Sequence, residues 1–577
     1  MALADYLLTD DLTILLALIA ATVFLLNNLY RPQPLVHPIL LGRQSDVGRA
    51  RNPGESAVYR NYGTGLMGRA DLYQFPLRPG KDVHILADFV RPEMEAPRTL
   101  WSTKLTNSHL QDRAAAFATG LLRLGRIQPQ KSTVLLLLND CLEFIVADLA
   151  LASHSISSIT LSSSKLLSPV LDAHPPSAIV THAFLLPQLL ELIYDSSEHQ
   201  TEHTIIVVGE PTPQAMASVA SNVKVYKFAE LEREGFKVEK ILSPLPKPSD
   251  IFTVSFYETE SGQIHGAQLT HENMTAGVAA VRAMFPLTSG MSPLDTLVSA
   301  HSMSTAYGRA IAYTAIYEGT SFASIQSSEL YYADENDVKT ENAQVVAARK
   351  YPIPSPTVLF LKPTHLASLV SGIIAEGKSS SWFLYSFAWR HKLAGVNDGF
   401  ITNQSLWDRL VFDSARAKVL GNGAATLREI IVSGGHIDLE TLTPARIALS
   451  VPLVNVFTHP LVAAPILASN PLDLQDLPSF STGKTGSMAH SGPPGVNVEV
   501  KLVGVNDEIV ENGGDPIGDV LVRGPPVGKL VVNLEDYVDV PRGTTSDSDA
   551  DAEAADGWTA TEAKARVQTN GAFQLIA

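Results

Sequence analysis

Residues 251–285 read IFTVSFYETESGQIHGAQLTHENMTAGVAAVRAMF, and this stretch decides the fold. It begins with IFTVSFY, which is apolar, β-branched and aromatic and therefore predicts a buried strand. It ends with MTAGVAAVRAMF, in which large apolar side chains recur at helical intervals. These residues are Met274, Val278, Val281 and Phe285. The sequence thus predicts a strand, a polar loop and a helix, in that order.

The polar loop contains Gly262 and Gly266, and Thr270 occupies the position of a helix N-cap. A strand, a glycine-containing loop and a helix together form an arrangement that holds phosphate. Glycine lets the backbone approach the anion, and backbone N–H groups point at it. Two glycines alone are a weak signal for such a site.

The end of this loop, GAQLTHEN, resembles the phosphate-binding signature of adenylate-forming enzymes, T-S-G-T-T-G-x-P-K-G-V-x-L-T-H-x-N. Most of the family's hydroxyl positions are replaced here, His265 stands for its lysine, and Glu258 and Glu260 add carboxylates. A carboxylate about 4 Å from a phosphate oxygen costs several kcal/mol at an effective dielectric constant near 20. Either the loop has lost its ligand, or it binds something other than ATP. The residues expected to be left of a nucleotide site are Ser261, Gly262, His265, Gly266 and Thr270.

Composition describes a large globular protein with an acidic balance. The 577 residues predict more than one domain or subdomain, and the formal net charge of −16 argues against a nucleic-acid partner. Cys141 is the chain's one cysteine, so it cannot form an internal disulfide, and the composition fits a reducing compartment.

Residues 1–30 are expected to form a membrane anchor, because the chain is almost continuously apolar from Leu12 to Leu26 and the stretch extends to Tyr30. The acidic start argues against a cleaved signal peptide, and a buried core helix would usually show a polar side. Arginines follow the segment, so the positive-inside rule predicts a single-pass protein whose body faces the cytosol. Residues 12–30 would then contact lipid, in the endoplasmic reticulum, peroxisome, mitochondrial outer membrane or lipid droplet.

The rest of the chain divides into an N-terminal extension, residues 31–97, and a main domain, residues 98–577. A helix is expected over residues 101–125, and strands alternate with helices beyond it, which predicts a doubly wound α/β fold with mostly parallel strands. Residues 326–356 are read as an inserted polar loop, and the end of the chain from about 480 is expected to be β-rich. The acidic stretch 547–556 is expected to be disordered.

Further segments resemble the same family in order along the chain. LNDCLEFIVADLALASHSI is similar to its N-S-x-E-F-x-x-A segment, and residues 297–325 to its second core segment, which places His301 and Met303 at an acyl pocket. SLWDRLVFDSARAKVLGNGAATLREIIVSGG is similar to long-chain fatty acyl-CoA synthetases, whose pattern is W-D-x-L-V-F, R, L-G, L-R and S-G-G. In the family that last turn, here Ser433, Gly434 and Gly435, lies beside the adenine.

Several catalytic positions of the family are replaced. Phe457 keeps the aromatic of the G-Y-G-x-T-E-T signature, but Leu461 stands where a glutamate would hold Mg²⁺, which needs oxygen ligands. Ala563 stands where the family's aspartate binds the ribose. The sequence ends at Ala577, where the family continues into a C-terminal lid domain, so the lid is expected to be absent unless this chain is a fragment or a mis-spliced gene model.

The resemblance implies the large N-terminal part of an acyl-CoA synthetase, with stacked α/β sheets and a β-rich subdomain. A shared fold does not by itself establish a shared function. The replaced catalytic positions therefore favour a membrane-anchored pseudoenzyme that acts as a scaffold for a protein partner or binds a fatty acid or acyl-CoA. That reading expects no catalytic residue, metal or cofactor. The alternative is an active long-chain fatty acid–CoA ligase that uses ATP, Mg²⁺ and CoA.

Overall fold

The computed structural model describes most of the chain. The described residues are 11–29, 36, 38–66, 75–125, 127–195, 203–241, 243–286, 289–325, 329–332, 351–475, 488–532 and 557–576. The acidic stretch 547–556 and most of the expected inserted loop, 326–356, lie outside them.

The deciding stretch lies in an eight-stranded sheet with the order β20-β11-β10-β6-β5-β7-β8-β9. Strands β5 to β10 are parallel, and β11 and β20 run antiparallel at one edge. The strands are β5 (Thr133–Leu137), β6 (Ser157–Leu161), β7 (Ala178–His182), β8 (His203–Val208), β9 (Val223–Lys227), β10 (Ile251–Glu258), β11 (Ile264–Thr270) and β20 (Lys529–Val531).

A second eight-stranded sheet has the order β17-β16-β15-β14-β12-β13-β3-β4. Its inner strands are parallel, and β17 and β4 pair antiparallel at its two edges. The strands are β3 (Arg98–Leu100), β4 (Thr103–Leu105), β12 (Thr296–Ser299), β13 (Ser321–Ser324), β14 (Val358–Leu361), β15 (Glu429–Val432), β16 (Leu453–Phe457) and β17 (Leu467–Ala468).

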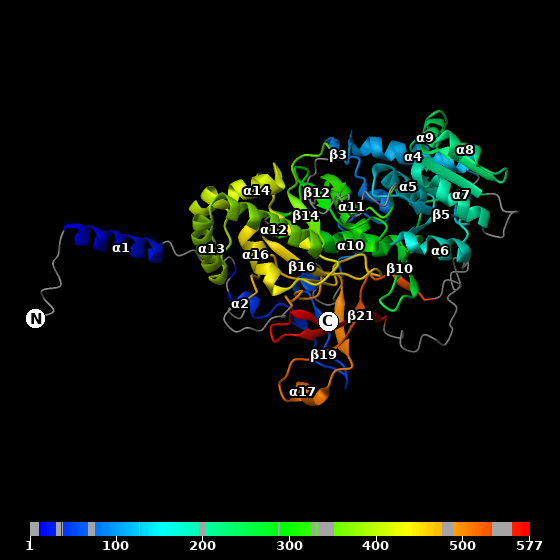
Figure 1. Ribbon diagram of the computed structural model, residues 1–577. Coiled ribbons are helices and arrows are strands. Elements are labelled where there is room, and N and C mark those ends of the chain that lie inside the picture. The colour runs from blue at the N-terminus through cyan, green and yellow to red at the C-terminus, as the bar shows by residue number, and fades with distance from the viewer. Residues whose placement is uncertain are drawn as a thin grey trace, which may run out of the picture.

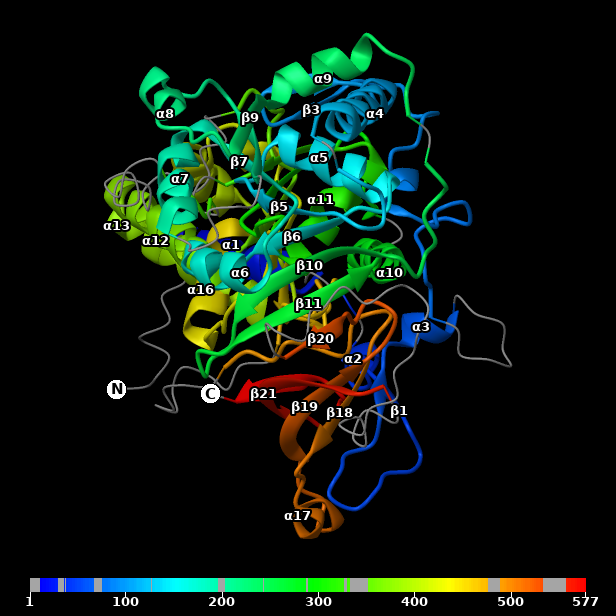
Figure 2. The same cartoon turned by 90° about the vertical axis from the view of Figure 1, so that its right-hand side faces the viewer.

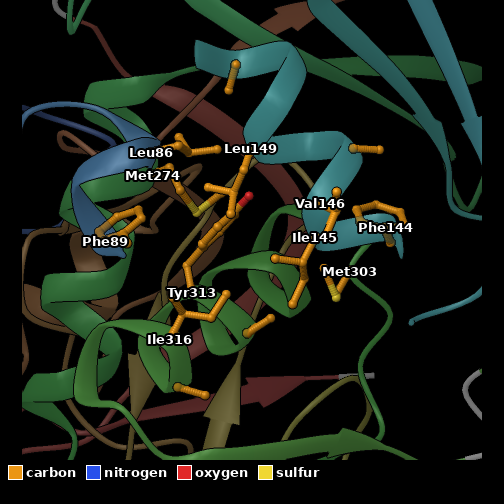
Figure 3. Close-up of a cluster of buried hydrophobic side chains, with 14 of the residues drawn as sticks. Leu86, Phe89, Phe144, Ile145, Val146, Leu149, Met274, Met303, Tyr313 and Ile316 are labelled. Atoms are coloured by element: carbon orange, nitrogen blue, oxygen red, sulfur yellow. The ribbon is translucent and has the colours of Figure 1, made fainter. Parts of the chain in front are cut away.

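The main core lies between these two sheets. Its helices are α4 (Asn107–Leu124), α5 (Leu142–Ser153), α10 (His271–Ala283) and α11 (Ala306–Glu318). The short 3-10 helix η2 (Leu86–Phe89) packs in the same core. Figure 3 shows side chains from α5, α10, α11 and η2 pointing toward one another. The expected helix over 101–125 is shorter at its start, because β3 and β4 precede it and Thr106 caps it at residue 107.

The predicted order of strand, loop and helix is wrong in its middle part. Residues 264–270 form strand β11, which makes an antiparallel hairpin with β10, so the loop shrinks to residues 259–263. The helix is confirmed as α10, and so is its cap: the Thr270 hydroxyl accepts a hydrogen bond from the Asn273 backbone N–H at 3.2 Å. The loop is therefore a hairpin turn at a sheet edge, away from the helix N-terminus.

The C-terminal part forms a third, six-stranded antiparallel sheet, β1-β2-β18-β19-β21-β22 (Figure 2). Two of its strands, β1 (Asp46–Val47) and β2 (Tyr59–Arg60), come from the N-terminal extension and pair through β18. The extension is thus an integral part of this sheet. The remaining strands are β18 (Glu499–Val503), β19 (Ile517–Arg523), β21 (Thr559–Val567) and β22 (Phe573–Ile576).

Four helices cover the second sheet at the end of the molecule opposite α7, α8 and α9 (Figure 1). They are α12 (Pro363–Ser380), α13 (Trp382–Asn397), α14 (Asp413–Leu420) and α16 (Leu439–Leu449). The first sheet carries α6 (Leu167–Ala173), α7 (Leu186–Asp195), α8 (Pro213–Ala217) and α9 (Phe228–Phe236).

The expected membrane anchor is the helix α1 (Asp11–Leu29). Over the described residues, no helix combines the length and the hydrophobicity that crossing a membrane requires. The expectation of a transmembrane helix is therefore not supported: the apolar run from Leu12 to Leu26 contains two threonines and is shorter than the about 20 residues that a span needs.

Candidate functional site

The switch points of the two large sheets give the first indication of a site. In the first sheet β5 lies between β6 and β7, and in the second sheet β12 lies between β13 and β14. In each sheet the next two strands along the chain therefore lie on opposite sides of this strand, which is what defines a switch point. Open α/β sheets bind ligands beyond the carboxyl ends of strands at such points. Asp140 follows β5, and His301 to Met303 follow β12.

These two strand ends touch each other. One oxygen of Asp140, Oδ1, accepts hydrogen bonds from the Ser302 hydroxyl at 3.1 Å and from the Met303 backbone N–H at 2.8 Å. Its other oxygen, Oδ2, is buried and has no hydrogen-bond partner among the described residues. Burial raises the pKa of Asp140 to about 7, and the two hydrogen bonds only partly oppose this rise.

The neighbouring strands of the second sheet add their own ends. The Ser433 hydroxyl, after β15, lies 2.8 Å from Nε2 of His301. Gly434 has a φ of +80°, and a Cβ there would lie 3.5 Å from Cε1 of His301 and 3.9 Å from Cγ of Lys362, which follows β14. We call this group of side chains the switch-point cluster; it consists of Asp140, His301, Ser302, Lys362, His365 and Ser433.

The electrostatics of the switch-point cluster favour one cation and two neutral imidazoles. Burial, with a smaller effect of Lys362, lowers the pKa of His301 to about 3 and that of His365 to about 4. Burial also lowers the pKa of Lys362, and the carboxyl of Asp140 opposes that shift. Within the described part of the chain, no hydrogen bond or ion pair engages Nζ of Lys362. A partly buried ammonium without a partner is suited to an anionic ligand group.

Sequence reasoning found part of this cluster and missed the rest. It placed His301 at an acyl pocket and Ser433 beside a nucleotide, and the structure joins the two by a hydrogen bond. Met303 lies in the main core (Figure 3) and contributes its backbone N–H. Asp140 and Lys362 were missed. Lys362 directly follows the apolar run VLFL, and Asp140 lies two residues after the run LLLL; each run predicts a strand that ends there.

The hairpin turn expected to hold phosphate uses its own donors. The backbone N–H of Gly262 donates to the Thr259 carbonyl at 3.0 Å, and that of Gln263 donates to the Thr259 hydroxyl at 3.1 Å. The Ser261 hydroxyl is 2.8 Å from the Thr259 hydroxyl. Gly262, with a φ of +79°, serves the turn. These donors are therefore already engaged within the turn.

His265 and Gly266 are internal residues of β11. His265 is buried opposite Tyr257, whose ring also meets His459, with ring centroids 6.0 and 5.8 Å apart. A Cβ at Gly266 would lie 3.1 Å from Phe256, so this glycine permits close packing between strands. Burial raises the pKa of Tyr257 to about 12 and lowers that of His459 to about 4.

Thr270 and Asn273 have a structural role in tying two parts of the fold together. The Asn273 amide donates to the carbonyls of Pro525 at 2.7 Å and Val527 at 3.0 Å while its oxygen accepts from Thr270. This explains the THEN ending of the signature, because the cap of α10 also fixes the segment that leads into β20.

The positions expected to hold metal and ribose do not fit these groups. Leu461 is buried in an apolar cluster with Val462 and Ile466, and Ala563 is half-buried on β21. Phe457, the last residue of β16, packs against the same cluster. Across the described ranges, no three His, Cys, Asp or Glu side chains gather in a way that could hold a metal ion.

The glycines after β15 form a tight turn, and their expected place beside a nucleotide stays a prediction. Gly435 packs against Pro363, to which a Cβ would approach within 3.1 Å, and the Ser433 backbone N–H donates to the Leu361 carbonyl at 3.0 Å. The turn thus holds the ends of β14 and β15 together, whatever it binds.

Comparison with known proteins identifies relatives of this architecture. The human long-chain-fatty-acid–CoA ligase 1 is 25% identical over 57% of this chain and 41% of its own length. The peroxisomal long chain acyl-CoA synthetase 7 of Arabidopsis thaliana is 24% identical over 67% of this chain and 51% of its own length. The chain thus spans about half the length of these relatives.

Solved structures share the fold. An anthranilate CoA ligase in complex with anthranoyl-AMP matches with a TM-score of 0.58 and 14% identity, covering 87% of this chain and 78% of that chain. A long-chain-fatty-acid-CoA ligase from Archaeoglobus fulgidus matches with a TM-score of 0.55 and 14% identity, covering 87% of this chain and 85% of that chain. The family described as AMP-binding enzyme matches residues 89–530. The chain therefore belongs to the AMP-binding enzyme family.

Proposed function

We propose that this protein binds a long-chain fatty acid or its CoA thioester at the switch-point cluster. The observation that carries the proposal is Lys362, an ammonium at the meeting point of two switch-point strands, without a partner among the described residues. A carboxylate or another anionic acyl head group would supply that partner. Neutral His301 and Ser433 lie beside it, hydrogen-bonded to each other, and bring no competing charge.

The relatives support the acyl part of this proposal. The matched human and Arabidopsis proteins carry names that specify long-chain fatty acids or long-chain acyl groups. Each buried methylene of such a chain contributes about 0.8 kcal/mol, so affinity is expected to rise with chain length.

We further infer that adenylation is weak or lost. Glu258 and Glu260 are exposed at the hairpin turn and would repel triphosphate, while the turn's N–H groups are engaged internally. Leu461 offers no oxygen to Mg²⁺ and Ala563 offers none to ribose, so ATP and its metal do not fit these residues.

An active ATP-dependent long-chain fatty acid–CoA ligase is the second candidate. The family match and the named activity of the relatives favour it, and they favour it more directly than they favour a protein without activity. In that case ATP, Mg²⁺ and CoA would be required, and residues other than those named above would have to hold the nucleotide.

Two calorimetric titrations with the full chain test both candidates. Palmitate is titrated first without and then with ATP and Mg²⁺. The proposal predicts saturable binding that is the same in both titrations and weaker for shorter fatty acids. Binding that appears only with ATP and Mg²⁺ would support the ligase, and no binding in either titration would end the acyl proposal.

A further inference from the structure

An aromatic surface on α13 and the turn that follows it has no place in the proposed acyl site. Helix α13 turns Tyr385, Ala388, Lys392 and Val396 toward the core and leaves the opposite side exposed. We call this exposed side, with the adjoining turn, the aromatic face. Its most exposed apolar residues are Trp382 at 71%, Phe383 at 63%, Phe387 at 46%, Leu406 at 64% and Leu410 at 51%.

These side chains form one continuous surface. The rings of Phe383 and Phe387 lie 5.0 Å apart between centroids, and Phe387 stacks on Trp407 at 6.4 Å. Leu406 precedes Trp407 directly, and Leu410 lies one helical turn beyond Leu406 in the π-helical segment Asp408–Phe412. A surface this apolar is uncommon on a soluble protein unless something binds it.

A buried ion-pair network holds the aromatic face rigid. Asp408 receives Lys392 from α13 at 2.7 Å and Arg416 from α14 at 2.8 Å, and all three side chains are buried. The face is therefore presented by a fixed scaffold, and its exposure is a property of the fold.

The charges around the aromatic face are positive, although the whole chain has a net charge of −16. Arg390 on α13 and Arg409 in the turn are exposed, as is Lys378 near the end of α12, and none of these three forms an ion pair within the described ranges. One exposed carboxylate, Asp398, lies at the far end of α13. The nearby carboxylates of Asp413 and Glu376 are paired with Arg416 and Lys418, at 3.2 and 2.7 Å. Exposed aromatic and leucine side chains beside arginines are the composition that inserts into the headgroup region of anionic lipid.

We propose that the aromatic face docks on an anionic lipid surface, with its rings at headgroup depth and its arginines on lipid phosphates. Helix α1, whose described side chains are exposed and mostly apolar, lies at the same end of the molecule as α13 (Figure 1). One bilayer surface could therefore contact both elements. The docking assigned to α13 is independent of α1 and of the acyl site.

A fluorescent label on the face tests this directly in the full chain. Cys141 is first changed to Ser, which is a preferred residue at the N-cap position that Cys141 occupies. Phe387→Cys then carries an environment-sensitive nitrobenzoxadiazole label, and Leu294→Cys, at a site 91% exposed away from the face, carries it as the matched control. Phe383→Cys is a second labelling site on the face.

With vesicles of an equal mixture of phosphatidylcholine and phosphatidylserine, the emission of the label at 387 or 383 should shift to the blue, and the label at 294 should not respond. Arg390→Glu combined with Arg409→Glu should weaken vesicle binding of the labelled face by at least about 30-fold. Each cation near an anionic surface contributes about 1 kcal/mol, so losing two accounts for about 30-fold, and the two added carboxylates repel the surface further. Vesicles of phosphatidylcholine alone should give a much smaller shift.

Three outcomes would overturn the proposal. The first is an unchanged emission at 387 and 383, whether or not the protein sediments with the vesicles. The second is a blue shift that grows with protein concentration without vesicles, which would assign the face to a second copy of this chain. The third is a shift that the double charge reversal leaves unaltered, which would exclude recognition of anionic lipid.

Discussion

At the scale of single residues, the acyl proposal depends on Lys362. Burial lowers the pKa of His301, so the imidazole beside the Lys362 ammonium is neutral. Burial raises the pKa of Asp140, so its carboxyl is only partly ionised near pH 7 and competes weakly with a ligand anion for the ammonium. A partly buried cation is costly unless something pairs with it, so a ligand anion would gain a charge-assisted hydrogen bond there.

Lys362→Met should therefore lower the affinity for palmitate roughly ten- to hundredfold, the loss expected for one hydrogen bond to a charged group. Lys378→Met, which changes an exposed lysine on the same helix, is the control and should leave affinity unchanged. Calorimetry measures both. Equal affinities for all three proteins would show that the head group binds elsewhere.

Asp140 should give the folded protein a defined pH dependence. Its pKa of about 7 in the fold lies above its ordinary value of 3.8, so its stabilising contribution is complete below pH 3.8 and is lost as pH rises through 7. His301 and His365 act in the opposite direction, because their folded pKa values are lowered. Only a comparison with an Asp140 variant separates these effects.

Between pH 5 and pH 8, wild type should lose stability relative to Asp140→Asn, by an amount on the order of 2 kcal/mol. Urea unfolding of both proteins at the two pH values gives this difference. If the difference in unfolding free energy between them is the same at both pH values, Asp140 does not titrate in this range.

At the scale of elements, the W-D-x-L-V-F motif is explained by packing. Asp408 is the centre of a buried network with Lys392 and Arg416 that joins α13 to α14. The Ser405 hydroxyl donates a hydrogen bond to the same carboxylate at 2.6 Å. A segment that resembles long-chain synthetases so closely thus keeps its residues for a structural reason.

Asp408→Asn should destabilise the protein by about 3–5 kcal/mol, because it removes the buried carboxylate that pairs with Lys392 and leaves Arg416 only the exposed carboxylate of Asp413. Asp398→Asn, at the exposed C-terminal end of α13, should cost less than about 0.5 kcal/mol. Chemical unfolding measures both. Similar small losses in the two variants would mean that Lys392 and Arg416 find other partners.

The hairpin shows where sequence reasoning fails. Strand β10 and helix α10 could be predicted from hydrophobic periodicity alone, but β11 could not, since its polar and glycine residues resemble a loop. Gly266 is needed there because β11 packs closely on Phe256 of β10 and on Val531 of β20, which lies far away in the sequence. The switch-point cluster likewise depends on strand order, which brings Asp140 to Ser302 and which no local pattern contains.

Substitutions in the β10–β11 hairpin should affect ATP affinity and protein stability differently. Glu258→Ser with Glu260→Thr, both exposed, should strengthen ATP binding by removing repulsion worth several kcal/mol at about 4 Å. Adding His265→Lys should instead lower stability, because His265 is buried against Tyr257 and His459 and a lysine there would be an unpaired charge. Calorimetry with ATP and urea unfolding measure the two effects. A triple variant that is as stable as the double would contradict the second expectation.

At the scale of the whole molecule, the α/β architecture and the family could be predicted from ordered motifs, and the match over residues 89–530 confirms the family. The extension could not be placed, because β1 and β2 are two-residue strands that acquire their role only by pairing with β18. Attachment through residues 12–30, with the body in the cytosol, stays a prediction. Alkaline carbonate extraction of the full chain tests it: release into the supernatant would contradict it.

The central claim is that an adenylate-forming fold here binds an acyl ligand without efficiently activating it. The most direct measurement is palmitate-dependent exchange of labelled pyrophosphate into ATP by the full chain, under conditions where palmitate binding has been confirmed by calorimetry. The account predicts saturable palmitate binding and exchange no greater than in a reaction without protein. Exchange that requires both palmitate and the protein would contradict it and establish the ligase.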